Sequence, residues 1–274
     1  GAASGIGFAM AEAFARVGVN IVLADVEPGA LKDASERIAS LGVTAVPIQT
    51  DVSAEADMDL LGELVRERFG KADILCLNAG VSGGGGAVRK LTTNDWKWAI
   101  DVNLYGIVHG LRVFLDDMQT ADEGHIVVTA SVAGLTSFPG SVPYNATKHA
   151  AVTISEGLFS ELQESGSNVR VHCICPGAVA TNIDKSERNR PKELQNDSAP
   201  QELPPGYDEF VAHINSMAKQ PEDVAELVMR AIVNDEFWIQ TDEYYRSAIK
   251  ARHTAIENDA DPPARGSVVS VYLD

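Results

Sequence analysis

The chain has 274 residues, 45% of them hydrophobic, and carries a formal net charge of −17. This charge argues against nucleic acid or an anionic membrane surface as a partner, and no apolar run reaches the roughly 20 residues that a membrane-spanning helix needs. The length and composition suit a globular protein with a sizeable core, which we expect to be cytoplasmic.

The first element is a glycine-rich turn, "GAASGIG" at 1–7, which runs into a helical pattern that ends at Gly18. A helix N-terminus offers unpaired N–H groups and a partial positive charge, so such a turn is typical of a phosphate site. It normally follows a β-strand. We expect an apolar strand to be missing ahead of Gly1, and the strands at 19–25 and 72–77 that would flank it to lie apart with unpaired edges.

Further along the chain, strand patterns at 19–25, 43–51, 72–80, 125–131, 169–177 and 237–241 alternate with helical patterns at 28–40, 53–69, 94–118, 143–165 and 221–233. This alternation predicts an α/β fold, a doubly wound parallel sheet in three layers. We expect one Rossmann-type domain over 1–241 and a C-terminal helix and tail over 242–274. A polar, proline-containing stretch at about 183–210 follows the end of a strand, where ligands bind in such folds, and is therefore a candidate lid that covers a binding site. The alternative is a solvated surface insertion.

Asp25 ends the strand at 19–25, about 20 residues after the glycines. A carboxylate at this position accepts hydrogen bonds from ribose hydroxyls and repels a 2′-phosphate. Val26 follows it, and Ala3 and Ser4 occupy the turn, so no basic residue is placed to hold that phosphate. The pattern favours NAD over NADP, and the alternative is that Asp25 only caps the turn before Pro28.

The stretch "SVAGLTSFPGSVPYNATK" contains Ser131, Tyr144 and Lys148. Tyr144 and Lys148 are four residues apart on a predicted helix and therefore share a face. Ser131 ends the preceding strand, at the sheet edge where the glycine turn also lies.

These pieces stand in one order with several others, and together they resemble the short-chain dehydrogenase/reductase family. The matching motifs are Gly-x-x-x-Gly-Ile-Gly at 1–7, Asp25, "DV" at 51–52, "NAG" at 78–80, "VNLYG" at 102–106, Ser131, Tyr144-x-x-x-Lys148 and "PGAVAT" at 176–181. The resemblance implies a seven-stranded parallel sheet and a nicotinamide cofactor.

The resemblance also implies the catalytic groups. Tyr144 would exchange a proton with the substrate oxygen, and the charge of Lys148 would lower the pKa of that tyrosine. Lys148 would also bind the nicotinamide ribose, Ser131 would hydrogen-bond the substrate oxygen, and Asn103 would hold a water that links Lys148 to solvent. Two residues have structural alternatives: Asn103 could be a helix-interior residue that kinks its backbone, and Ser131 a strand-end turn residue.

Cofactor contacts are implied at the glycine turn, at the ends of the following strands and after the strand at 169–177. The residues are Gly1, Ser4, Gly5, Ile6, Gly7, Asp25, Val26, Asp51, Val52, Asn78, Ala79, Gly80, Tyr144, Lys148, Pro176, Gly177, Val179 and Thr181. Asn78 could instead bridge neighbouring strands, and Thr181 could only cap the segment that follows it.

The expected activity is hydride transfer between NAD and a secondary alcohol or ketone. Ser131, Phe138, Val142 and Tyr144 are the expected substrate contacts, and the apolar pair among them suggests a hydrophobic substrate. The alternatives are an NADPH-dependent ketone reductase and a non-catalytic NAD(H)-binding protein.

The family implies a homodimer or homotetramer joined through the helices at 94–118 and 143–165. Ile154, Leu158 and Leu162 recur at helical spacing. They are predicted to give the helix more apolar surface than one core face can bury. The tail at 267–274 is a second candidate contact.

The remaining reactive side chains are predicted to be structural. Three cysteines show no metal-ligand spacing, and Cys173 and Cys175 alternate on one strand, which favours buried reduced thiols over a redox or metal site. We expect no metal. The histidines at 109, 149 and 172 are interpreted as structural.

Overall fold

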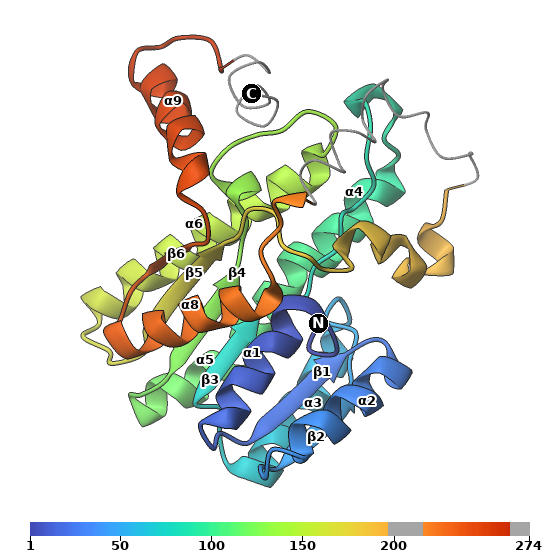
Figure 1. The fold of residues 1–274 in the computed structure, drawn as a ribbon, viewed down its shortest axis with the longest axis vertical. Helices are drawn as coiled ribbons and strands as arrows, with labels where there is room; N and C mark the ends of the chain where they lie inside the picture. Colours follow the sequence, from blue (N-terminus) through green and yellow to red (C-terminus); the bar gives the residue numbers. More distant parts are fainter. Residues whose placement is uncertain (197–215, 264–274) are drawn as a thin grey trace.

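The structure is a computed structural model that describes residues 1–196 and 216–263 (Figure 1). Its strands are β1 Ile21–Asp25, β2 Ala45–Gln49, β3 Ile74–Leu77, β4 His125–Thr129, β5 Arg170–Cys175 and β6 Trp238–Gln240. Its α-helices are α1 Gly5–Arg16, α2 Pro28–Ala39, α3 Glu55–Phe69, α4 Thr93–Ile100, α5 Gly106–Ala121, α6 Val142–Glu164, α8 Pro221–Asn234 and α9 Arg246–Glu257. Residues 197–210 of the predicted lid at 183–210 and residues 264–274 of the tail lie outside the described residues.

The strands form two parallel sheets. One sheet has the order β1-β2 and the other β3-β4-β5-β6, and every described pair is parallel. Among the described strands, β1 is not hydrogen-bonded to β3, so the expected separation of these two strands is confirmed. The continuous seven-stranded sheet that the resemblance implies is not seen, because no described strand lies between β1 and β3.

Helices cover both faces of the strands, which gives the predicted three layers (Figure 1). On one face, residues of α1, α2 and α8 pack with Val127 of β4 and Ile174 of β5. On the other face, residues of α3, α5 and α6 pack with Ile126 and Val128 of β4. Successive strand residues therefore serve opposite faces, as the pleat requires, and the sheet is buried on both sides.

The predicted long helix at 94–118 is three joined segments. A capping box between Thr92 and Asp95 starts α4. The chain then passes through the π-helical segment η2, Asp101–Tyr105, into α5. A π-helical turn adds a residue to the helix and often marks a functional site, and Asn103 lies within this one.

Three apolar residues of α6 that were expected to support a subunit contact pack inside the chain's own core. Leu158 and Leu162 are buried in the chain's own core, and Ile154 packs against the same cluster. The helix was expected to have more apolar surface than one core face could use. Strands β4 and β5 and helix α5 contribute to that cluster as well, so it accommodates these side chains within one chain.

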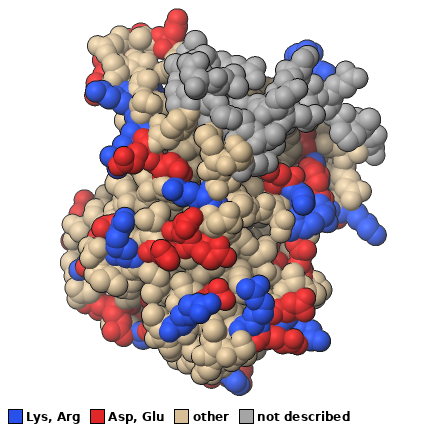
Figure 2. All heavy atoms as spheres, in the orientation of Figure 1, with Lys and Arg blue, Asp and Glu red and all other residues tan. Residues whose placement is uncertain are grey.

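The cysteines are free thiols, and Cys173 and Cys175 are fully buried with their Sγ atoms 3.9 Å apart. In the described part of the chain, no three His, Cys, Asp or Glu side chains are arranged to hold a metal. No described helix is long and apolar enough to cross a membrane. Acidic and basic side chains are interspersed on the face shown in Figure 2, where the two signs can pair with each other.

Candidate active site

The glycine turn closes against its surroundings in a way that side chains would prevent. A β-carbon on Gly7 would lie 1.9 Å from the carbonyl oxygen of Gly1. Gly5 has a φ of +57°, and a β-carbon there would lie 3.1 Å from the Cγ2 atom of Thr181. Ser4 occupies the N-cap of α1 without a side-chain capping bond. The first amide groups of α1 therefore remain available to a ligand.

Asp25 lies beside this turn, at the C-terminal end of β1. Its carboxylate accepts hydrogen bonds from the N–H groups of Ala3 at 2.9 Å and Glu27 at 3.0 Å. Burial alone would raise the pKa of Asp25, but the groups around its carboxylate, these two N–H donors among them, hold it below its ordinary value. Asp25 does cap its own turn, and a carboxylate has room for further hydrogen bonds beyond those it makes here.

Asn78 connects three elements, so the strand-bridging interpretation is confirmed. Its Nδ2 donates to the carbonyl of Gly1 at 3.0 Å, and its Oδ1 accepts from the hydroxyl of Thr129 at 3.0 Å. β3 ends at Leu77, three residues before the end of the strand pattern predicted at 72–80. Ala79 lies against Gly1, and the next residue, Gly80, would direct a β-carbon to 3.5 Å from the Lys148 Nζ atom.

The side chain of Asp51 is already engaged within its own turn. It accepts from the backbone N–H of Ser53 at 2.9 Å and from the Ser53 hydroxyl at 2.6 Å. The carbonyl of Val52 lies 2.9 Å from the Nδ1 atom of His109, which has the structural place expected of it. Val26, the residue after Asp25, is exposed.

Asn103 is 1% exposed and uses its whole amide. Its Oδ1 accepts from the Val81 N–H at 2.7 Å, and its Nδ2 donates to the Val81 carbonyl at 2.9 Å and the Thr147 hydroxyl at 3.0 Å. The side chain thus ties the segment after β3 to α6. The interpretation of Asn103 as an interior residue in an altered helix agrees with its place in η2.

Ser131, Tyr144 and Lys148 come together at the C-terminal end of β4. Ser131 accepts from the N–H of Ala133 at 3.1 Å, as a turn residue does, and its hydroxyl donates to the carbonyl of Pro176 at 3.4 Å. Ser131 also lies close enough to Tyr144 to affect the pKa of that tyrosine. The Lys148 Nζ atom lies 5.5 Å from the centre of the Tyr144 ring and donates to the carbonyl of Thr129 at 2.8 Å. Sequence reasoning missed Thr129, whose position two residues before Ser131 on one strand was the available signal.

The electrostatics of this pair differ from the expectation. Burial raises the pKa of Tyr144, and the charge of Asp184 raises it further, whereas Ser131 acts to lower it. Burial lowers the pKa of Lys148 to about 8. The lowering of the tyrosine pKa that the resemblance implies is not seen in this structure, because both groups lose solvation and the ammonium donates to a carbonyl.

The chain after β5 returns over the glycine turn. Gly177 donates its N–H to the Thr241 hydroxyl at 3.0 Å, and a β-carbon on it would lie 2.4 Å from the ring of Tyr245. Pro176 and Val179 flank this glycine, and Val179 forms a bridge with Lys219. The Thr181 hydroxyl accepts from the N–H of Ile183 at 3.4 Å, although Asn182 is the N-cap of the segment that follows.

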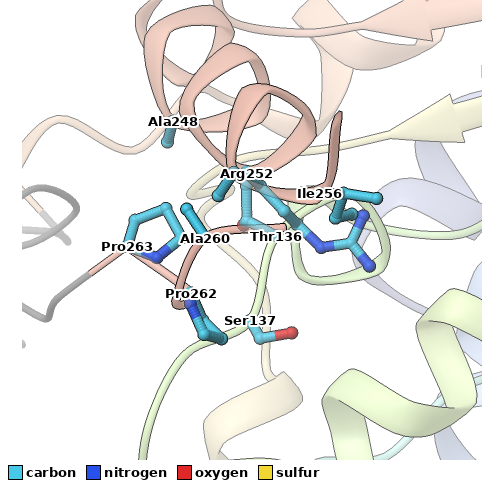
Figure 3. Close-up of a pocket in the computed structure, with 9 residues that line it drawn as sticks. Thr136, Ser137, Ala248, Arg252, Ile256, Ala260, Pro262 and Pro263 are labelled. Carbon is cyan, nitrogen blue, oxygen red and sulfur yellow. The ribbon is translucent and has the colours of Figure 1, made fainter. Parts of the chain in front are cut away.

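Two cavities lie beside α9. One of about 330 Å³ is formed by α9, the turn after it and Thr136–Ser137 (Figure 3). The other, of about 500 Å³, is lined by the two apolar residues of the predicted substrate site, Phe138 and Val142, and not by its two hydroxyl residues, Ser131 and Tyr144. This cavity therefore brings together only the apolar part of the predicted substrate site.

Comparisons with known proteins agree with this geometry. Residues 1–192 match the short chain dehydrogenase family. A protein of Lactiplantibacillus plantarum named CLA biosynthesis dehydrogenase/reductase is 30% identical over 266 residues, which cover 96% of this chain and 93% of that protein.

Two solved structures differ in their bound cofactors. A short chain dehydrogenase/reductase from Burkholderia phymatum in complex with NAD has a TM-score of 0.92 and 39% identity, covering 96% of this chain and 94% of the other. An alcohol dehydrogenase from Thermococcus sibiricus complexed with 5-hydroxy-NADP has a TM-score of 0.69 and 26% identity, covering 88% and 91%. The fold is shared over nearly the whole chain, whereas the bound dinucleotide is not.

Proposed function

The chain belongs to the short-chain dehydrogenase family, and on that premise we propose that it interconverts hydrophobic secondary alcohols and their ketones with NAD in preference to NADP. Membership makes it an oxidoreductase that acts on an alcohol or ketone with a nicotinamide cofactor. The observation that carries the proposal is the grouping of Ser131, Tyr144 and Lys148 beside the glycine turn.

The donors and acceptors around the glycine turn fit a dinucleotide. Amide groups at the start of α1 suit phosphates, and the Asp25 carboxylate suits ribose hydroxyls while it repels a 2′-phosphate. When bound, NAD supplies the acceptor for the hydride. Val26, Asp51, Val52, Asn78, Ala79 and Gly80 are proposed to line the adenosine side and floor, and Pro176, Gly177, Val179 and Thr181 the nicotinamide side.

Proton transfer is assigned to Tyr144. In the direction of oxidation, the substrate O–H proton passes to the phenolate oxygen of Tyr144, while Ser131 donates a hydrogen bond to the substrate oxygen. An unperturbed tyrosine pKa of about 10 must fall by two to three units for this, which corresponds to about 3–4 kcal/mol of preferential phenolate stabilisation. Burial acts against this stabilisation in the structure, and the ammonium of Lys148, 5.5 Å from the centre of the Tyr144 ring, is the charge proposed to overcome it.

Asn103 supports this cluster from behind. It bonds both backbone polar groups of Val81 and so fixes the Gly80–Val81 turn next to Lys148. That a water on Asn103 connects Lys148 to solvent stays a prediction.

The preference for a hydrophobic substrate rests on the segment after Ser131. Phe138, Pro139 and Val142 are apolar residues that line the cavity of about 500 Å³ next to α6. Pockets that select apolar ligands are built from such side chains with a few polar groups.

We further infer that the enzyme is a homodimer or homotetramer. The support is the exposed apolar surface at the start of α5, where Tyr105 is 48% and Val108 39% exposed. Light scattering on the purified protein would report a mass of two or four chains, and a mass of one chain would contradict the inference.

The test of the proposed function is turnover of the unmodified protein. A series of secondary alcohols of increasing chain length is supplied with NAD or NADP, and the reduced nicotinamide is followed. We expect kcat/KM to rise with chain length and to be at least about tenfold higher with NAD. Equal values for the two cofactors would refute the preference, and no turnover of any alcohol or ketone with either would indicate a protein that only binds the nucleotide.

A further inference from the structure

The turn that carries Asp25 also carries a second carboxylate, Glu27. The backbone N–H of Glu27 donates to the Asp25 carboxylate, so the two acidic side chains belong to one rigid turn. The Glu27 Oε1 atom accepts hydrogen bonds from the Arg188 Nη2 atom at 2.6 Å and the Asn189 Nδ2 atom at 2.8 Å. A guanidinium from a distant part of the chain is thereby neutralised next to the proposed ribose site.

The segment that delivers Arg188 is fixed at both ends. At one end Thr181 lies over Gly5, in the glycine turn. At the other end Arg190 forms a buried ion pair with Asp95 at 2.8 Å. Between them runs the short helix η4, Ile183–Asn189. The backbone therefore holds Arg188 beside the β1–α2 turn, whatever its side chain contacts there.

The Arg188 side chain itself is only partly buried. It is 39% exposed, and its Nη1 atom also donates to the carbonyls of Asn182 and Lys185. A guanidinium binds phosphate oxygens as readily as a carboxylate, often through two parallel hydrogen bonds. Without its ion pair to Glu27, the Arg188 guanidinium would be the cation that a 2′-phosphate needs beside Asp25.

We propose that Glu27 is a second cofactor-selecting residue, which excludes NADP by keeping Arg188 in an ion pair and by adding its negative charge behind Asp25. The inference rests on the proposed function, because it concerns the same nicotinamide dinucleotide site. Asp25 repels the extra phosphate directly. Glu27 removes the one compensating interaction that the turn could offer among the described residues.

The test is a binding measurement on Glu27→Gln, Arg188→Met and the double variant. Dissociation constants for NAD, NADP and adenosine 2′-monophosphate are measured by intrinsic fluorescence, with no substrate present. We expect Glu27→Gln to bind NADP and adenosine 2′-monophosphate roughly tenfold more tightly, with NAD changed by less than about threefold. The double variant should lose this gain, because the guanidinium that binds the phosphate is gone.

Arg112→Met is the matched control. Arg112 pairs with Asp59 at 2.6 Å and is 41% exposed, but this ion pair joins α3 and α5. Its loss should leave all three dissociation constants unchanged.

Three outcomes would overturn the inference: no gain in Glu27→Gln, a gain that persists in the double variant, or equal weakening of NAD and NADP. The last would make Glu27 a structural support only. The NAD-to-NADP ratio of the unmodified protein tests the proposed function separately, since the inference concerns how the variants change that ratio.

Discussion

Lys148 lies one helical turn after Tyr144 on α6, yet its ammonium donates to the carbonyl of Thr129 at 2.8 Å rather than to the tyrosine. The residue is 3% exposed, so the charge is largely removed from water. A buried ammonium with one described hydrogen bond is costly to the fold. This cost leads to the first prediction.

Replacing Lys148 with methionine should stabilise the protein at neutral pH while it abolishes turnover. The pKa of Lys148 is about 8 in the folded chain against an ordinary 10.5, so the folded state disfavours the charged form. The penalty is fully present below pH 8 and disappears as the pH rises towards 10.5, where the unfolded side chain also loses its proton. We expect a gain of about 1–3 kcal/mol at pH 7, after allowance for the lost hydrogen bond.

Urea unfolding of the parent and Lys148→Met at pH 7 and pH 10 measures this gain. The difference between the two proteins should shrink at the higher pH. A variant that is less stable than the parent at pH 7 would contradict the argument.

Asp25→Asn should narrow the preference for NAD by about tenfold or more, because a repulsive charge facing the 2′-phosphate is removed. The pKa of Asp25 lies below its ordinary value, so the carboxylate is charged throughout the pH range in which the enzyme is handled. The NAD-to-NADP ratio of kcat/KM in the parent should therefore not vary between about pH 7.5 and pH 9, where the 2′-phosphate also keeps its full charge. A ratio that changes within this range would show that another group sets the preference.

Arg190→Met should destabilise the protein by about 3 kcal/mol, because it leaves the Asp95 carboxylate buried without its cation. Both side chains of this pair are nearly inaccessible, at 4% and 6% exposure. Arg112→Met removes an exposed pair of similar geometry and should cost less than about 1 kcal/mol. Chemical denaturation of the two variants decides the point, and equal losses would mean that burial of the Asp95 pair is unimportant.

Two histidines should make the protein sensitive to acid. The Nδ1 atom of His125 lies 2.9 Å from the Nε2 atom of His172, whose own Nδ1 atom lies 2.7 Å from the Glu236 carbonyl. Burial lowers the pKa of both, and Arg170 adds to this while Asp235 opposes it. The folded state then binds fewer protons than the unfolded state, so the free energy of unfolding should fall as the pH drops below about 6.5.

Replacement of both histidines by phenylalanine tests this prediction through the slope of stability against pH. The double variant should show a flatter slope between pH 7 and pH 5, whatever its stability at pH 7. An unchanged slope would assign the acid sensitivity to other groups.

Local patterns predicted much of the fold and part of the site. Four-residue spacing places Tyr144 and Lys148 on one face of α6. The strand pattern places Ser131 at the edge of the sheet, where the strand before α6 ends. The contacts that the sequence did not predict are long-range: Asp95 with Arg190, Glu27 with Arg188, and Asn103 with Val81. No spacing rule relates residues that only the fold brings together.

Charges and burial were also beyond sequence reasoning. The pKa of Tyr144 depends on how much water the folded chain removes from it, which the motif does not specify. The apolar series of α6 at 154, 158 and 162 was assigned to a subunit contact, because periodicity cannot tell an internal partner from an external one.

The central claim is that the Tyr144 hydroxyl transfers the proton during alcohol oxidation, and Tyr144→Phe tests it most directly. The measurement compares kcat with a secondary alcohol and the dissociation constant of NAD in the parent and the variant. We expect kcat to fall by at least about a hundredfold, the lower bound for losing a general acid/base, with the dissociation constant of NAD nearly unchanged. Turnover within tenfold of the parent would contradict the account, since the chemistry would then proceed without that hydroxyl.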